Sequence, residues 1–334
     1  MNITDVARAA GVSIATVSRA FGSPEKVTDE TRAHIEAVAK KLGYIPNSSA
    51  RVLRTRRSNV LGVVLPTLIN PVFAECLEGI ARAAHTRGYS ILPITTDYQI
   101  DAEARAVNLF IASNVDGVLL VVSNPAQSAA LDNLKARHIP YVLAYNAHDA
   151  HPCVSVDSEA AVAEVVSWLV GKGHRRIAMV AGHLSASDRA QRRHRGYLKA
   201  MASHGIAPCD LIEVPFMDAS VEIIGRHLTR EQPPSALFCS NDLLAIRSIR
   251  AAHDAGLKVP EDVSIVGFDG IELGMDLTPR LTTIVQPNRE MGRVCVTLLA
   301  DGLAAGTPLT QAASRTLAHT LRLGESAAPF TDPN

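Results

Sequence analysis

Residues 3–21 read ITDVARAAGVSIATVSRAF. The first apolar residues of this stretch, from Ile3 to Ala10, recur at helical spacing and predict one buried helix face. Gly11 permits the positive φ of a tight turn, and Ser13 can cap a second helix through its hydroxyl. Two short helices joined in this way predict a helix-turn-helix, whose second helix fits a DNA major groove. A plain helical hairpin is the alternative interpretation.

A third helix is expected from Thr28 to Leu42. Thr28 can cap it, and the acidic residues that follow suit its first turn. Gly43 ends it, so the sequence predicts a three-helix head over residues 1–46. In the second helix, Val17 and Ala20 are expected to face inward.

The charge of the chain is divided unevenly between its two ends. Residues 1–57 hold ten Lys/Arg and five Asp/Glu, a net charge of +5, whereas the whole chain of 334 residues has 33 of each. The remainder therefore carries 23 basic and 28 acidic residues, a net charge of −5. A basic head on an acidic body is expected when only the head meets phosphate.

Residues 47–59 follow the head as a short basic segment. Residues 48–54 can form two turns of helix, which is too short to be stable alone. Leu53 lies among arginines, so a helix that forms only on DNA could insert this side chain between base steps of the minor groove. An ordinary basic linker is the alternative, and the spacing alone does not decide between them.

From Val60 onward, short apolar strands alternate with helices. The strands lack polar alternation, which is typical of a parallel sheet buried on both faces. The pattern runs over residues 60–145 and restarts over residues 153–268, and this repetition predicts two doubly wound lobes. A late strand at 316–323 and its neighbours are expected to cross between the lobes. We therefore predict a two-lobed body over residues 60–324 and a flexible tail over residues 325–334.

Other features exclude several classes of protein. The five cysteines are scattered without metal-binding spacing, and their odd number does not suit a disulfide framework. The chain has no apolar run that could span a membrane and no signal peptide. It has no nucleophile elbow or P-loop. We therefore expect a cytoplasmic protein that is not an enzyme, with no cofactor, no metal and no membrane partner.

Taken in order, the motifs resemble the LacI/GalR family of bacterial transcriptional repressors, nearly end to end. The head carries ITDVA, GVS, TVSR, LGYIPN and ARVL, which begin at residues 3, 11, 16, 42 and 50. The body carries GKGHRRI, GY, ND, GLKVP, VGFD and LTTI, which begin at residues 171, 196, 241, 256, 266 and 281. The resemblance implies an all-α helix-turn-helix head and an α/β body of two doubly wound lobes, like a periplasmic binding protein. It also implies a homodimer on a pseudo-palindromic DNA operator.

The resemblance places the DNA contacts on the second helix and the basic segment. Arg19 can donate two hydrogen bonds to guanine, whereas Ile14 and Ala15 can make only apolar contacts with bases. Leu53 takes the position of the family's intercalating residue. The expected DNA contacts are Thr4, Ser13, Ile14, Ala15, Thr16, Ser18, Arg19, Asn47, Arg51 and Leu53.

The resemblance implies a small molecule between the lobes, where the carboxyl ends of parallel strands and their loops face the cleft. Asp269 can accept hydrogen bonds from neighbouring hydroxyls of a sugar, and Arg193 offers a planar fork of donors. Phe73 offers a face for stacking. The expected effector contacts are Asn70, Phe73, Asp97, Tyr145, Asn146, Arg189, Arg193, Phe216, Asn241 and Asp269.

The charge of the effector is a separate question. Arg189 and Arg193 are four residues apart near the start of a predicted helix, where like charges and cations are unfavourable. This local cost suggests an anionic ligand, a sugar acid or a sugar phosphate. The alternative is that Arg189, Arg192 and Arg195 are solvated, or paired with Asp188 or across a dimer interface.

The sequence therefore predicts a repressor whose operator affinity is altered by a sugar, sugar acid or sugar phosphate. A two-lobed solute-binding or sugar-processing protein is the alternative from another class. An activator on the same scaffold also remains open. The sequence does not state whether the effector weakens or strengthens operator binding.

Overall fold

The computed structural model describes residues 1–44, 57–215 and 220–330. The chain forms two compact units, Met1–Ser58 and Asn59–Asn334, and each is described by itself. Four residues of the predicted sites lie outside the described residues, namely Asn47, Arg51, Leu53 and Phe216.

The first unit contains the three helices that the sequence predicts. They are α1 (Ile3–Ala10), α2 (Ile14–Gly22) and α3 (Asp29–Lys41), with a short 3₁₀ turn η1 (Pro24–Lys26) between the last two. Gly11 adopts a φ of +66° after α1. The Ser13 hydroxyl caps α2 by accepting a hydrogen bond from the Thr16 amide at 3.1 Å. Small and β-branched side chains form the core of this unit, among them Val6, Ala10, Val17, Ala20, Ile35 and Ala39.

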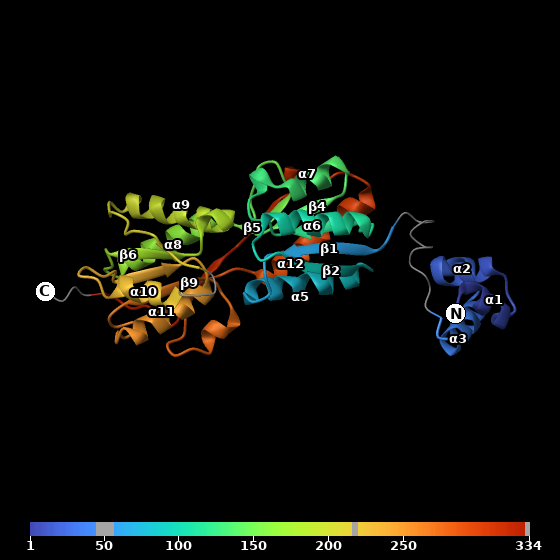
Figure 1. The fold of residues 1–334 in the computed structure, drawn as a ribbon, viewed down its shortest axis with the longest axis horizontal. Helices are drawn as coiled ribbons and strands as arrows, with labels where there is room; N and C mark the ends of the chain where they lie inside the picture. Colours follow the sequence, from blue (N-terminus) through green and yellow to red (C-terminus); the bar gives the residue numbers. More distant parts are fainter. Residues whose placement is uncertain (45–56, 216–219, 331–334) are drawn as a thin grey trace. The chain divides into compact units, whose positions relative to one another are not determined.

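The first lobe of the body is built on a six-stranded sheet with the order β11-β5-β4-β3-β1-β2. All its strand pairs are parallel. Its strands are β1 (Val60–Leu65), β2 (Ser90–Thr95), β3 (Gly117–Leu120), β4 (Tyr141–Ala144), β5 (Cys153–Val156) and β11 (Arg315–Leu317). Its helices are α5 (Pro71–Thr86), α6 (Ile100–Ala112), α7 (Ala129–Ala136) and α12 (Asn288–Ala305), with the 3₁₀ turns η2 (Pro125–Gln127) and η5 (Gln311–Ala313). Helices α5 and α12 pack together, as do α6 and α7 (Figure 1).

The second lobe repeats this plan with the strand order β12-β10-β9-β8-β6-β7. Its strands are β6 (Ile177–Ala181), β7 (Ile212–Glu213), β8 (Ala236–Cys239), β9 (Ser264–Asp269), β10 (Thr282–Val285) and β12 (Thr320–Arg322). Its helices are α8 (Ser158–Gly171), α9 (Asp188–Ser203), α10 (Ser220–Leu228) and α11 (Asp242–Asp254), with η3 (Leu184–Ala186) and η4 (Glu272–Met275). Only β12 runs antiparallel to its neighbour. The two doubly wound lobes confirm the predicted fold class.

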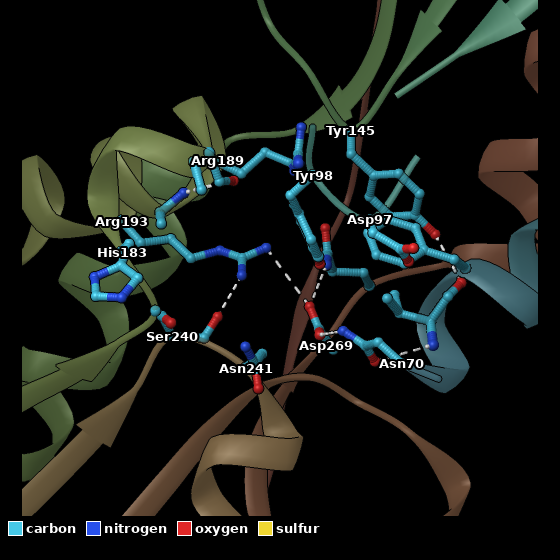
Figure 2. Close-up of a pocket in the computed structure, with 17 residues that line it drawn as sticks. Asn70, Asp97, Tyr98, Tyr145, His183, Arg189, Arg193, Ser240, Asn241 and Asp269 are labelled. Carbon is cyan, nitrogen blue, oxygen red and sulfur yellow. Dashed lines mark hydrogen bonds and ion pairs between the residues drawn. The ribbon is translucent and has the colours of Figure 1, made fainter. Parts of the chain in front are cut away.

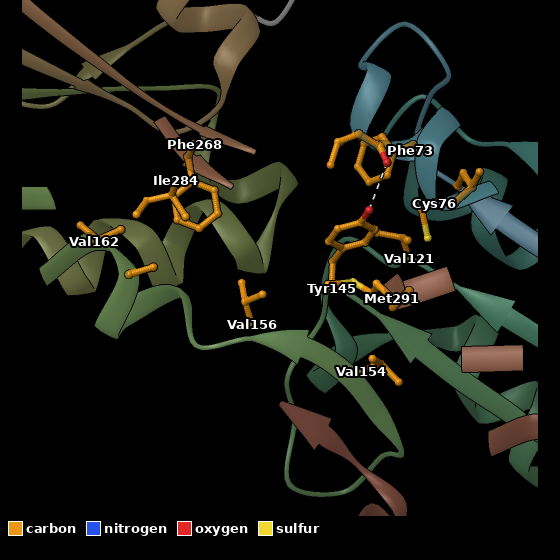
Figure 3. Close-up of a cluster of buried hydrophobic side chains, with 14 of the residues drawn as sticks. Phe73, Cys76, Val121, Tyr145, Val154, Val156, Val162, Phe268, Ile284 and Met291 are labelled. Atoms are coloured by element: carbon orange, nitrogen blue, oxygen red, sulfur yellow. Dashed lines mark hydrogen bonds between the residues drawn. The ribbon is translucent and has the colours of Figure 1, made fainter. Parts of the chain in front are cut away.

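The chain crosses between the lobes three times, after β5, after β10 and between β11 and β12. The expected crossing at residues 316–323 is confirmed: the segment forms two short strands, one in each sheet. One continuous apolar core runs through the crossings. Figure 3 shows Val156 between Phe268 and Ile284 of the second lobe and Tyr145 and Met291 of the first.

The predicted flexible tail is also corrected over residues 325–330, which pack on the second lobe. Ser326 is fully buried, and its hydroxyl donates to the Ile265 carbonyl at 2.6 Å. The Phe330 ring stacks on His174 with ring centroids 5.4 Å apart. The polar composition of this segment predicted a flexible tail. The composition gives no sign of these contacts, because the hydrogen bonds are made to the ends of strands that are distant in the chain.

Two glycines set the distance between α5 and α12. A Cβ at Gly79 would lie 2.1 Å from the Arg289 carbonyl oxygen, and one at Gly292 would lie 2.2 Å from the Cys76 carbonyl oxygen. Because both obstacles are backbone atoms, neither can move without separating the helices. The close packing of these helices therefore requires glycine at both positions.

We expect Gly79→Val to lower the free energy of unfolding by about 1–3 kcal/mol, because overpacking forces the helices apart. Gly171→Ala is the matched control, since a Cβ there meets nothing within 4 Å. Urea unfolding followed by circular dichroism measures both. Equal stabilities of the two variants would contradict this account.

Candidate functional site

A cavity of about 220 Å³ lies between the lobes, with residues from both contributing to its walls (Figure 2). Most of its walls come from strand ends and the helix starts that follow them, as the fold class predicts. The structure brings eight predicted residues together around it, namely Asn70, Phe73, Asp97, Tyr145, Arg189, Arg193, Asn241 and Asp269.

Asp269, the last residue of β9, is the central acceptor of the cavity. Its side chain is 3% exposed. Its Oδ2 accepts from Asn70 Nδ2 at 3.2 Å, and its Oδ1 accepts from Gln286 Nε2 at 2.9 Å. Arg193 Nη2 lies 3.5 Å from Oδ1 as an ion pair. Burial raises the pKa of Asp269, and the charge of Arg193 opposes that rise.

Arg193 points from α9 into the cavity. Its Nη1 donates to the Ser240 carbonyl, and its guanidinium carbon lies 3.8 Å from the centroid of the Phe268 ring. A cation over an aromatic face is attracted by the ring's quadrupole. Its Nε has no hydrogen-bond partner within the described part of the chain. Arg193 is therefore held in place while one donor remains unused.

Arg189, one turn earlier on α9, binds the first lobe directly. Its Nη1 donates to the Val122 carbonyl at 2.8 Å and lies 3.1 Å from Asp188 Oδ1. The Asp188 amide donates to the Ser123 carbonyl at 2.9 Å. Pairing of Arg189 with Asp188, the alternative considered from the sequence, is therefore present in the structure. These contacts also close one side of the cleft.

Asn146 is a predicted effector contact that the structure places behind the cavity wall. It is fully buried, and its amide bonds both the nitrogen and the oxygen of Val122. Its Nδ2 also donates to Asp188 Oδ1 at 2.7 Å. The sequence could place Asn146 at the end of β4 but could not show that Val122 occupies its hydrogen-bonding groups.

The first lobe supplies an aromatic wall. The rings of Phe73 and Tyr145 meet edge to face, with centroids 5.6 Å apart and planes at 86°. The Tyr145 hydroxyl donates toward the Val72 carbonyl and Asn288 Oδ1, at 3.1 and 3.2 Å. This pair therefore presents a fixed apolar surface to a bound molecule.

Two asparagines cap the helices that begin at the cavity. Asn70 Oδ1 accepts from the Val72 amide at 3.3 Å at the start of α5, and Asn241 Oδ1 accepts from the Leu244 amide at 2.8 Å at the start of α11. Each cap fixes its side chain at a strand end. Asn70 then uses its amide nitrogen to reach Asp269 across the cleft.

The backbone of four cavity residues adopts positive φ, an uncommon conformation for residues other than glycine. The values are 49° at Asp97, 60° at Tyr98, 64° at Tyr145 and 123° at Asp269. Such conformations persist where the surrounding structure imposes them, and they gather at functional sites. Their concentration here supports the cavity as a binding site.

Sequence reasoning missed several lining residues, among them Tyr98, His183, Ser240 and Gln286. Ser240 and Gln286 directly follow β8 and β10, so the strand-end rule that found Asn241 would also have found them. Tyr98 adjoins the predicted Asp97. His183 lies in the loop after β6, and its residue type gave no separate signal.

The outward face of α2 matches the prediction for the head. Ser13, Ile14, Ala15 and Arg19 are exposed, whereas Val17 and Ala20 are buried. Thr4 is exposed at the start of α1, and Thr16 and Ser18 are half-buried. A docked DNA groove would therefore meet one large cation and a small apolar surface.

Other classes of site are not visible in the described segments. No group of three or more His, Cys, Asp or Glu there could hold a metal ion. No helix within the same residues is long and apolar enough to cross a membrane.

A helix-turn-helix unit and a two-lobed body with an inter-lobe cavity define the class of ligand-binding DNA-binding regulators. Comparison with known proteins supports each part: the lacI family of bacterial regulatory proteins matches residues 2–47, and the periplasmic binding protein-like domain matches residues 166–327. The chain belongs to the LacI family of transcriptional regulators.

Individual relatives match along most of the chain. The HTH-type transcriptional repressor CytR of Escherichia coli (strain K12) is 35% identical over 303 residues, which cover 89% of this chain and 88% of the relative. The Lac repressor dimer bound to operator and the anti-inducer ONPF has a TM-score of 0.87 at 27% identity, over 98% of this chain and 99% of that one. The transcriptional regulator CelR in complex with cellobiose has a TM-score of 0.71 at 26% identity, over 98% and 100%.

A second carboxylate, Asp242, holds the turn that carries Asp269. It is fully buried at the start of α11, where its Oδ1 accepts from the Thr283 hydroxyl at 2.5 Å and its Oδ2 accepts from the Ile271 amide at 2.8 Å. Gly267 must lack a side chain, because a Cβ there would lie 2.1 Å from Asp242 Oδ1. Burial, and then the nearby charge of Asp269, raise the pKa of Asp242 from 3.8 to about 8.

This raised pKa makes stability depend on pH. The folded state holds a proton on Asp242 that the unfolded state releases above pH 4, so this contribution is present at low pH and is lost as pH rises toward 8. We expect the free energy of unfolding of the wild type to fall, relative to Asp242→Asn, by up to about 1.4 kcal/mol per pH unit in that window.

Denaturant unfolding between pH 4.5 and 8.5 measures the difference. Asp254→Asn, at an exposed position of the same helix, is the control and should keep the wild-type slope. Parallel slopes for the wild type and Asp242→Asn would show that the carboxyl titrates normally.

Proposed function

We propose that this chain is a transcriptional repressor that binds a pseudo-palindromic operator as a homodimer and takes a sugar-derived effector in the inter-lobe cavity. A sugar, a sugar acid and a sugar phosphate all fall within this class. The observation that carries the proposal is one cavity in which Asp269, Arg193 and Asn70 converge from both lobes. The proposal gives the chain no catalytic role and places it in the cytoplasm, where its operator would lie.

Recognition of DNA would divide between two segments. Arg19 would donate to a guanine from the exposed face of α2, with Ile14 and Ala15 against neighbouring bases. Thr4, Ser13, Thr16 and Ser18 would contact phosphates. Asn47, Arg51 and Leu53 would act from the hinge, with Leu53 as a wedge in the minor groove.

Relatives support both halves of this proposal. The Lac repressor structure contains a dimer on its operator, and the CelR structure contains cellobiose. A hydroxyl-rich ligand suits the cavity, because carboxylate, amide and guanidinium groups can together satisfy several hydroxyls. Phe73 and Tyr145 would contact the apolar side of the ring.

The mechanism would be a shift between lobe arrangements. A ligand that contacts Asp269 and Asn70 at once favours the closed arrangement, because its binding energy depends on both lobes. In a dimer, a change of lobe angle would alter the spacing of the two hinge segments. An activator would use the same steps, and only the position of its operator would differ.

The test begins with a thermal-shift screen of sugars, sugar acids and sugar phosphates on the full chain. We expect Arg193→Ala to weaken binding of the compound that gives the largest shift by roughly ten- to a hundredfold, because a charged donor is lost. Operator binding in a mobility-shift assay, with a duplex from the region upstream of the chain's own gene, should be retained.

Arg195→Ala is the control, because Arg195 lies on the same helix but pairs with Glu159 at the surface. It should leave both ligand and operator binding unchanged. If a folded Arg193→Ala protein lost operator binding, this would contradict separate sites for the effector and the operator. Failure of the wild type to retard any upstream duplex would count against the repressor itself.

A further inference from the structure

Two arginines of the second lobe that line the cavity each carry one buried hydrogen-bond donor that the described residues leave unsatisfied. Arg189 and Arg193 are 6% and 7% exposed, and both line the cavity (Figure 2). Arg189 Nη2 and Arg193 Nε have no hydrogen-bond acceptor among the residues that the structure describes. A buried charged donor without an acceptor is more unfavourable than a neutral one.

Of the two nearby carboxylates, that of Asp269 is fully engaged, whereas Asp188 Oδ2 has no hydrogen-bond partner among the described residues. Asp269 accepts from Asn70 and Gln286 and also pairs with Arg193. Asp188 lies beside Arg189 but does not line the cavity. Burial raises the pKa of Asp188, and the charges of Arg189 and Arg192 oppose that rise. Each guanidinium thus has a carboxylate neighbour and still lacks one acceptor.

The placement of the two arginines also favours an anion. Both project from the first two turns of α9 (Asp188–Ser203), where the helix itself contributes partial positive charge. They are four residues apart. Burial lowers the pKa of Arg193, the charge of Asp269 opposes that fall, and the charge of Arg189 adds to it. A negative group bound near both arginines would reduce their mutual repulsion further.

We propose that the effector is an anion, a sugar acid or sugar phosphate whose carboxylate or phosphate accepts hydrogen bonds from Arg189 and Arg193. The inference rests on the proposed function and narrows its ligand class. Arg189 also donates to Val122 of the first lobe. An anion at Arg189 therefore binds at a residue that already joins the lobes, so anion recognition and closure share one side chain.

The experiment uses the full chain and a matched panel. D-glucose, D-galactose and D-ribose are compared with their aldonic acids and their terminal phosphates at equal ionic strength, by thermal shift and then by isothermal titration. We expect at least one anionic member to raise the melting temperature and to bind at least tenfold more tightly than its neutral parent, since charge-assisted bonds are the stronger class. The acid and phosphate arms distinguish the two sources of negative charge.

Two variants test whether Arg189 is responsible for the tighter binding of the anion. Arg189→Met should weaken binding of the anion by roughly ten- to a hundredfold and reduce its advantage over the neutral parent. Arg192→Met is the matched control, because Arg192 lies on the same helix but donates to the Ala147 carbonyl and does not line the cavity. It should keep the wild-type selectivity. Unfolding curves of both variants establish that they are folded.

Several results would overturn the inference. These are a neutral sugar that binds as tightly as its acid and phosphate, no shift with any anionic member, or equal losses in the two variants. A neutral sugar that binds tightly and changes operator binding in the mobility-shift assay would support the proposed function but contradict an anionic effector. If the wild type without any ligand does not bind the operator, the proposed function itself is contradicted.

Discussion

The arrangement of the cavity depends on one buried carboxylate, that of Asp269. It ends β9 in the second lobe, yet it accepts a hydrogen bond from Asn70 of the first lobe. A carboxylate without partners would not be stable at this depth, so Arg193 and Gln286 are required beside it. Asp242 in turn fixes the turn that follows Asp269. The site is therefore a set of polar groups that keep one another in place.

The same groups connect recognition to lobe closure. Asn70 caps α5, so a helix of the first lobe is tied to the strand end that presents Asp269. On the other side of the cleft, Arg189 and Asp188 bind Val122 and Ser123. A molecule that competes for either set of bonds changes the energy of the closed arrangement. Such a two-lobed body suits a regulator, because both faces of its ligand belong to parts that can move relative to each other.

The sequence predicted the fold well because its signals are local. Gly11, the caps at Ser13 and Thr28, and the apolar strands act over a few residues, and all were found in the structure. The rule that strand ends and the helix starts after them face the cleft likewise predicted eight of the lining residues. The failures concern partners far apart in the chain. Asn146 forms its hydrogen bonds with Val122, and Ser326 is buried against Ile265.

The bond between Asn70 Nδ2 and Asp269 Oδ2 joins the two lobes across the cavity, and we expect its loss to change how the lobes lie relative to each other. Pulsed electron spin resonance on the full chain tests it directly, with nitroxide amino acids at Leu109 of the first lobe and Leu198 of the second, which are 52% and 38% exposed. Asn70→Ser keeps a helix-capping hydroxyl but is too short to reach Asp269. We expect a broader distance distribution in this variant, shifted from that of the wild type. Superimposable distributions would contradict it.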